Sequence, residues 1–134
     1  VLLSELDNVR PRLWELRHDG KAWQRTRIAT PENAQVNVVG TYWDSNEFFV
    51  ATQGFTQPTT LELRTAGGPQ AEPLKSLPRF FDASGLVTRQ FEATSADGTR
   101  IPYFVVMREG TKLDGSNPTL LYGYGGFEVS QLPW

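Results

Sequence analysis

Residues 122–127, with the sequence YGYGGF, place three glycines, two tyrosines and a phenylalanine in six consecutive positions. Glycine has no Cβ atom, so such a segment lets the backbone turn sharply and approach a ligand closely. A tyrosine hydroxyl on such a loop can donate a hydrogen bond to the oxygen that becomes negative when a carbonyl turns tetrahedral. The segment therefore indicates a loop that binds a ligand or stabilises developing charge.

Three interpretations of this loop differ in what they require of the neighbouring sequence. A phosphate-binding loop is disfavoured, because the Lys and Ser/Thr of a P-loop are missing and no helical pattern follows. The glycine-rich loop of an α/β-hydrolase, which helps to form an oxyanion hole, fits the composition. A packing role, with a buried tyrosine and a core phenylalanine, fits it as well. The loop alone leaves these last two open.

The residues of a Ser-His-acid mechanism are not found in the chain. A G-x-S-x-G nucleophile segment does not occur, and Ser84, Ser95 and Ser116 stand in predicted loops. The single histidine, His18, precedes Asp19-Gly20 and is expected to be a solvated turn residue rather than a base. Residues 1–134 therefore cannot complete a Ser-His-acid mechanism by themselves.

Metal and cofactor chemistry is not expected. With one histidine and no cysteine, carboxylates would have to supply most of the ligands. The acidic residues near turns are expected to cap backbone amides, namely Asp44, Glu47, Asp97 and Asp114. The four tryptophans suggest either carbohydrate stacking or packing. Trp14, Trp23 and Trp43 fall in or beside predicted strands, which favours packing in a core or between the blades of a β-propeller; Trp134 does not.

Residues 119–122 (TLLY) are predicted to be the strand that carries the loop. The run is apolar on both faces, as in the middle of a parallel sheet covered by helices. Ligands bind at the carboxyl ends of such strands, where residues 122–127 would lie. Because no crossover helix is present, the partner strands are expected outside the chain, in the remainder of the same polypeptide. Unpaired strand edges would then favour self-association of the isolated chain.

The remainder of the chain shows the pattern of antiparallel strands. Short runs rich in β-branched and aromatic residues alternate with turn residues. Asp-Gly pairs at residues 19–20 and 97–98 predict tight hairpin turns, and Pro102 predicts an edge strand. The predicted strands cover residues 12–17, 22–28, 35–42, 47–53, 59–64, 86–94 and 100–107.

Two domains are predicted. Two meanders within the first 75 residues match two consecutive blades of a β-propeller, although a self-contained β-sandwich fits the pattern nearly as well. Residues 65–78, with three prolines and two glycines, are predicted to be a loop or crossover. The boundary is therefore expected between residues 1–76, the C-terminal blades, and residues 77–134, the crossover and the first strands of a second domain.

Composition excludes several classes of protein. The 134 residues are 39% hydrophobic and 21% charged with a net charge of -2, which is not the composition of a disordered or nucleic-acid-binding chain. No apolar run approaches the ~20 residues of a membrane helix. The first residue is Val, so the natural N-terminus is expected to be missing, and the compartment is left open between cytoplasm and periplasm or secretion.

Residues 97–134 resemble the entry into the catalytic domain of the prolyl oligopeptidase family of serine peptidases. The shared segments are DGT at residues 97–99, IP at 101–102, KLDG at 112–115, Pro118, and YGYGGF at 122–127. In that family a seven-bladed propeller precedes an α/β-hydrolase domain. The resemblance implies a mainly β chain: the last blades of a β-propeller followed by the first strands of an α/β-hydrolase domain.

The resemblance also implies roles for the loop residues. Tyr124 matches the tyrosine whose hydroxyl stabilises the tetrahedral oxyanion, and Phe127 matches an aromatic residue that lines the pocket for proline. Loop shaping falls to Tyr122, Gly123, Gly125 and Gly126. The parent protein would cleave short peptides after proline, without a cofactor and without nucleic-acid or membrane partners. The alternative is a non-catalytic propeller or sandwich module that binds a protein or a glycan.

Overall fold

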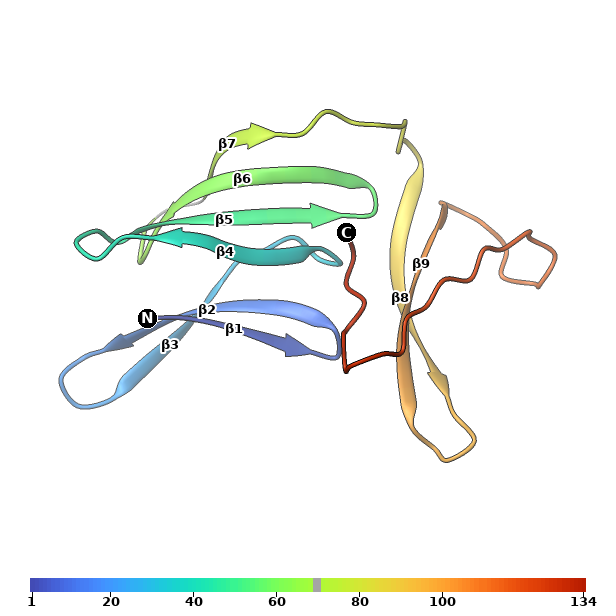
Figure 1. The fold of residues 1–134 in the computed structure, drawn as a ribbon, viewed down its shortest axis with the longest axis horizontal. Helices are drawn as coiled ribbons and strands as arrows, with labels where there is room; N and C mark the ends of the chain where they lie inside the picture. Colours follow the sequence, from blue (N-terminus) through green and yellow to red (C-terminus); the bar gives the residue numbers. More distant parts are fainter. Residues whose placement is uncertain (69–70) are drawn as a thin grey trace.

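The computed structural model of the chain describes residues 1–68 and 71–134. Within this part of the chain every regular element is a β-strand, and nine strands form three antiparallel sheets (Figure 1). No helix that could cross a membrane occurs among the described residues. The mainly β class predicted from the sequence is confirmed.

The first sheet is a three-stranded meander of β1 (Leu2–Asp7), β2 (Arg10–His18) and β3 (Trp23–Ile28). Strands β2 and β3 agree with the predicted strands. Strand β1 was not predicted, because its turn to β2 contains neither glycine nor proline. That turn is formed by Asn8 and Val9, whose φ angles of 51° and 56° lie in the left-handed region. Left-handed φ at both central positions is what a two-residue hairpin turn requires.

The second sheet is a four-stranded meander of β4 (Gln35–Thr41), β5 (Glu47–Gly54), β6 (Gln57–Thr65) and β7 (Glu72–Ser76). The prediction that residues 65–78 form only a loop is wrong for β7, which pairs with β6 at the edge of the sheet. Its proline is tolerated because an edge strand needs hydrogen bonds on one side only. Residues 69 and 70 of the predicted loop lie outside the described residues.

The core lies between these two sheets. Leu13 of β2 packs with Val36 of β4 and with Phe48 and Val50 of β5, and the exposed fractions of these side chains are 2%, 6%, 3% and 0%. Phe48 and Val50 are two residues apart and so lie on one face of their strand. Successive meanders packed in this way are the arrangement of neighbouring β-propeller blades, as the sequence predicted.

The third sheet is a hairpin of β8 (Leu86–Thr94) and β9 (Arg100–Arg108), and it stands crosswise at one end of the other two sheets (Figure 1). The predicted Asp-Gly turn is present, with Gly98 at a φ of 86°. Pro102 pairs only with Glu92 of β8, so its missing N–H faces no partner strand among the described residues. The predicted hairpin and the edge position of Pro102 are confirmed.

Residues 109–134 contain turns but no strand. Residues 119–122, predicted to be a strand whose partners lie outside the chain, form no strand ladder in this structure, in which Leu120 and Leu121 are 94% and 92% exposed. A strand needs a neighbour for its backbone hydrogen bonds, and no strand of the described residues lies beside this segment. The segment returns to the second sheet at Pro133, which is fully buried and whose carbonyl accepts a hydrogen bond from Gln35 N at 3.2 Å.

The tryptophans do not form a common core. Trp23 is 60% exposed and Trp43 is fully exposed, so the predicted packing role is not found for them in this chain. Trp14 is half-buried, and its indole Nε1 donates a hydrogen bond to Glu5 at 2.7 Å while Arg25 stacks on its ring at 3.8 Å. The sequence pattern could not separate these cases, because β-rich segments present side chains to both faces of a sheet.

Candidate active-site loop

The YGYGGF loop lies on the irregular segment between β9 and the second sheet. Its two functional candidates are accessible: the side chain of Tyr124 is 50% exposed and that of Phe127 is 94% exposed. Neither belongs to the buried core cluster between the first two sheets. The packing interpretation of the loop, a buried tyrosine beside a core phenylalanine, is therefore not what the structure shows.

The sharp turn of the loop is made by residues other than its glycines. Phe127 and Glu128 have φ angles of 54° and 55°, and Val129 N donates to the Gly126 carbonyl at 3.2 Å to close the turn. Two left-handed residues in succession define a tight turn that most side chains disfavour. None of the three glycines of the loop has a positive φ. The left-handed conformations of this turn therefore fall on Phe127 and Glu128 and not on the glycines.

Gly126 has a different role, which is to leave room for the Tyr124 ring. A Cβ atom at residue 126 would lie 2.7 Å from the Tyr124 hydroxyl oxygen and 2.9 Å from its Cζ atom. A Cβ atom at Gly123 or Gly125 would meet no atom within 4 Å. The phenol thus folds back over residue 126, and only that glycine is required by a contact.

The Tyr124 hydroxyl makes no hydrogen bond with the described residues. A phenol carries one donor and can accept as well, so this group is available to a ligand. A donor of this kind stabilises an oxyanion only if it is aimed at the position where the charge develops. In this structure the Tyr124 hydroxyl is a donor on an exposed loop, without a partner among the described residues.

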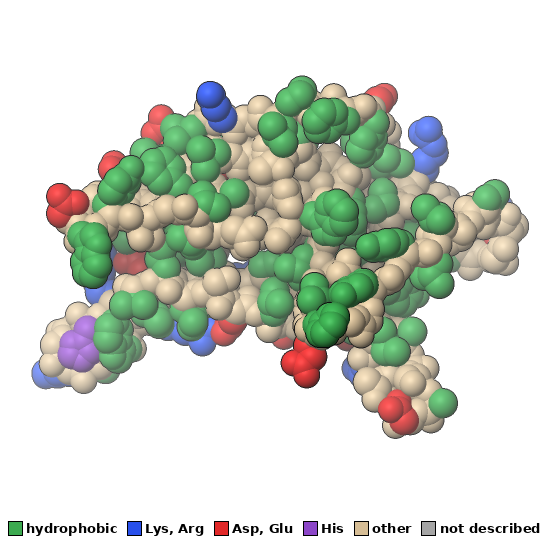
Figure 2. All heavy atoms as spheres, in the orientation of Figure 1, with side chains coloured by type: hydrophobic (Ala, Val, Ile, Leu, Met, Phe, Trp, Pro, Cys, Tyr) green, Lys and Arg blue, Asp and Glu red, His purple; other side chains and the backbone are tan. Residues whose placement is uncertain are grey.

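The other residues considered as catalytic candidates have structural roles. His18 is exposed at the end of β2, where its Nδ1 accepts a hydrogen bond from Gly20 N at 3.1 Å and its ring contacts Trp23. Figure 2 shows the imidazole at the tip of the β2–β3 hairpin. Ser116 donates to Asp114 Oδ1 at 2.6 Å within its own turn. The prediction that His18 is a solvated turn residue is confirmed.

Acidic residues cap turns, as predicted for two of the four. Asp97 accepts from Thr99 N at 3.0 Å, and Asp114 accepts from Ser116 N at 3.0 Å. Hydrogen bonds favour the ionised carboxylates and lower the pKa of both side chains, chiefly through the Ser116 hydroxyl for Asp114 and through the Thr99 backbone amide for Asp97. At the start of β5 the cap is instead Ser45, whose hydroxyl accepts from Glu47 N. No group of His, Cys, Asp and Glu that could hold a metal ion occurs within residues 1–68 and 71–134.

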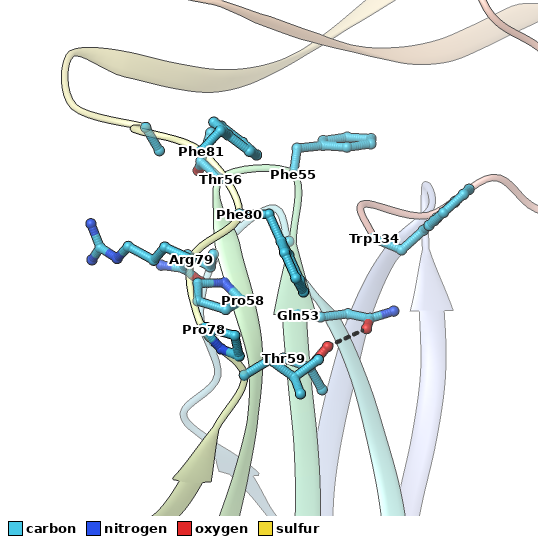
Figure 3. A pocket seen from close by; sticks show the side chains of 14 residues that line it. Gln53, Phe55, Thr56, Pro58, Thr59, Pro78, Arg79, Phe80, Phe81 and Trp134 are labelled. Atoms are coloured by element: carbon cyan, nitrogen blue, oxygen red, sulfur yellow. Dashed lines mark hydrogen bonds between the residues drawn. The ribbon is translucent and has the colours of Figure 1, made fainter.

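A pocket of about 350 Å³ lies at the end of the second sheet rather than at the glycine loop (Figure 3). It is surrounded by aromatic side chains, namely Phe55 of the β5–β6 turn, Phe80 and Phe81 of the loop between β7 and β8, and Trp134. Gln53 and Thr59, joined by a hydrogen bond of 2.8 Å, form its polar wall. Sequence reasoning did not identify these residues, although the consecutive aromatics after Pro78 were a usable signal.

Known peptidases resemble this chain along nearly its whole length, although no family model matches it. It is 41% identical over 133 residues to the uncharacterized peptidase y4nA of Sinorhizobium fredii, a match that covers 99% of this chain and 18% of that protein. It is 37% identical over 132 residues to prolyl oligopeptidase A of Galerina marginata, covering 95% of this chain and 17% of the relative.

Solved structures give the same result. A structure described as a post-proline cleaving enzyme from Rickettsia typhi matches with a TM-score of 0.77 at 32% identity, covering 99% of this chain and 19% of that one. Oligopeptidase B from Trypanosoma brucei matches with a TM-score of 0.82 at 23% identity, covering 98% and 20%, and it shares the fold.

Sequence and structure therefore define a segment that contains neighbouring β-propeller blades. The chain belongs to the prolyl oligopeptidase family. It spans about a fifth of the length of the relatives it matches, at 18% and 19% of the first two.

Proposed function

We propose that this chain is part of a serine-type oligopeptidase that hydrolyses short peptides on the carboxyl side of proline, and that Tyr124 stabilises the oxyanion of that reaction. The observation that supports this most directly is the half-exposed Tyr124 side chain on the YGYGGF loop, with its hydroxyl open to a ligand. Relatives named prolyl oligopeptidase and post-proline cleaving enzyme support the substrate class.

In the proposed mechanism a serine hydroxyl attacks the carbonyl carbon of proline while a histidine accepts its proton. The carbonyl oxygen becomes an anion, and the Tyr124 hydroxyl donates a hydrogen bond to it together with a backbone amide. One donor of this kind contributes about 3 kcal/mol of transition-state stabilisation. The serine, histidine and acid are supplied by polypeptide outside residues 1–134, so the isolated chain is inactive.

Phe127 is proposed to contact the substrate proline. Its ring is 94% exposed, so its apolar face is available. A pyrrolidine ring presents hydrocarbon to such a surface and has no backbone N–H to satisfy. Tyr122, Gly123, Gly125 and Gly126 shape the loop without contacting the reacting atoms.

The proposed domain boundary follows the same division. Residues 1–76 are the propeller part, and the meander of the second sheet ends with β7 at Ser76. Residues 77–134 are the crossover and the first segments of the hydrolase domain, beginning with the β8–β9 hairpin. The alternative, a non-catalytic module that binds a protein or a glycan, would be favoured by a Tyr124 sealed in a core, and its side chain is half exposed.

The test is Tyr124→Phe in the full-length protein, assayed on a chromogenic peptide with proline before the scissile bond. We expect kcat to fall on the order of 10²- to 10³-fold with KM little changed, because the lost hydrogen bond acts in the transition state. Tyr122→Phe is the matched control and should retain activity. An unchanged kcat for Tyr124→Phe would contradict the oxyanion role, and absence of post-proline cleavage by the full-length protein would contradict the function.

A further inference from the structure

The β8–β9 hairpin is attached to the first two sheets mainly through polar side chains. Strand β8 presents residues 88, 90 and 92 on one face, because side chains two apart in a strand share a face. Phe104 of β9 lies directly opposite Gln90 and so belongs to the same face. Figure 1 shows the hairpin crosswise at the ends of both sheets, and side chains of this face contact residues of each.

The first attachment is the left-handed turn between β1 and β2. Asn8 Nδ2 donates to Glu92 Oε1 at 2.6 Å, and the Asn8 carbonyl accepts from Gln90 Nε2 at 2.7 Å. The other side-chain atom of that amide, Gln90 Oε1, accepts from Arg10 Nε. Glu92 also forms an ion pair with Arg100 of β9, which orients its carboxylate. One amide and one carboxylate of β8 therefore hold both the backbone and the side chain of the turn.

The second attachment involves the second sheet. Asn33, in the loop before β4, donates from Nδ2 to the Thr88 carbonyl at 3.2 Å, and its φ of 50° is also left-handed. Phe55 and Phe104 meet edge to face with their ring centroids 6.0 Å apart. Asparagine is one of the few residues that adopts a left-handed φ readily, and its amide supplies the donor in both attachments.

We propose that Asn8, Asn33, Gln90 and Glu92 form a hairpin latch that sets the angle of β8–β9 against the two sheets and can release without unfolding either sheet. Local release is expected because the hydrogen bond between Asn8 and Glu92 lies at the surface and the hairpin adds to it an edge-to-face contact between Phe55 and Phe104. Regions held by few apolar contacts and solvent-exposed hydrogen bonds open at low free energy. The inference does not depend on the proposed function of Tyr124.

The sharpest test reverses donor and acceptor. Asn8→Asp keeps a residue that tolerates the left-handed turn but sets a carboxylate against Glu92, so the hairpin should be released. Adding Glu92→Gln to that variant restores a hydrogen bond with its direction exchanged, from the new amide at residue 92 to the new carboxylate at residue 8. Glu92→Gln alone is the matched control, because its side-chain oxygen still accepts from Asn8 while the ion pair with Arg100 is lost.

The readout is the distance distribution between spin labels at Thr26→Cys and Ala96→Cys, two exposed positions in a chain that has no native cysteine. We expect Asn8→Asp to broaden this distribution on the order of twofold, while the far-ultraviolet circular dichroism signal of the β-sheets stays unchanged. The double variant should restore the width measured for the parent chain. Asn8→Gly, which removes only the donor and eases the turn, should broaden it as well. An unchanged width in Asn8→Asp or Asn8→Gly, or a double variant as broad as Asn8→Asp, would overturn the latch.

Discussion

Gly126 and Tyr124 are in direct apposition: a Cβ atom added at residue 126 would lie 2.7 Å from the Tyr124 hydroxyl oxygen. The ring of Tyr124 therefore occupies the volume that any other residue at position 126 would fill. Glycine at residue 126 leaves the room that the phenol occupies in this structure. It makes residue 126 the loop position at which substitution has the most direct effect on the proposed oxyanion donor.

Gly126→Ala is expected to push the Tyr124 phenol away from its resting position. In the full-length protein kcat should fall roughly 10- to 100-fold, because displacement of a catalytic group by about 1 Å has effects of that size. Gly125→Ala is the matched control, since its Cβ atom would meet nothing within 4 Å. Equal loss of activity in both variants would show that the contact with Tyr124 is not the cause.

Glu128→Asn is expected to stabilise the turn that follows the loop. Glu128 has a φ of 55°, and a left-handed conformation costs roughly 1–2 kcal/mol for most residues but less for Asn. Hydrogen exchange at the Val129 amide, which closes this turn, should slow by about 3- to 5-fold. Glu128→Gln removes the charge without easing the backbone, so its exchange rate should match the parent. A slower rate in Glu128→Gln would assign the effect to charge instead.

The Asp19 carboxylate is expected to make the β2–β3 turn sensitive to acid. Hydrogen bonds from Ala22 N, from Gln24 Nε2 and from Lys21 N lower the Asp19 pKa from 3.8 to about 2. Because the folded pKa is depressed, this contribution to stability is present above about pH 4 and is lost as the pH falls through about 2.

An NMR titration of the aspartate carboxyl carbons checks this expectation. The Asp19 signal should titrate near pH 2, and the amide shifts of Lys21 and Ala22 should follow it. In Asp19→Asn those amide shifts should stay flat over the same pH range. A midpoint at the ordinary value for aspartate would contradict the hydrogen-bonded turn.

Leu120→Lys/Leu121→Lys is expected to reduce self-association of the isolated chain. These leucines are 94% and 92% exposed, and adjacent exposed apolar side chains on an unpaired segment favour contacts between molecules. Sedimentation should show oligomers for the parent chain and a monomer for the double variant. Leu113→Lys removes a leucine that is 66% exposed outside this segment and should leave the oligomers intact. Oligomers that persist in the double variant would argue against association through this segment.

Local turn chemistry was predictable from the sequence. The Asp-Gly pairs at residues 19–20 and 97–98 are found in the turns of the β2–β3 and β8–β9 hairpins, since glycine alone enters the left-handed region without cost. The turn at Asn8 and Val9 was missed, because valine is a poor residue for a left-handed φ and long-range contacts from β8 hold the turn in place. Turn propensities depend on the local sequence only, so they cannot predict a turn that is stabilised by contacts with a distant strand.

The loop residues were predictable only in part. The type and order of residues 122–127 fitted an accessible loop and a buried one equally well, and the structure leaves Tyr124 and Phe127 accessible. The strand predicted at residues 119–122 requires neighbours that the described residues do not supply. The left-handed turn fell on Phe127 and Glu128 rather than on glycine, because spacing alone does not specify which backbone dihedrals a loop adopts.

The hydrogen bond from Gln35 N to the Pro133 carbonyl has a mechanical consequence. Residues 109–132 therefore form a loop that is held at one end by β9 and at the other by the hydrogen bond to β4. The free-energy cost of closing such a loop, which is entropic, rises by only about 0.6 kcal/mol for each doubling of its length. Insertions or deletions in this loop therefore change the stability of the fold little, while they change how far Tyr124 and Phe127 extend from the sheets.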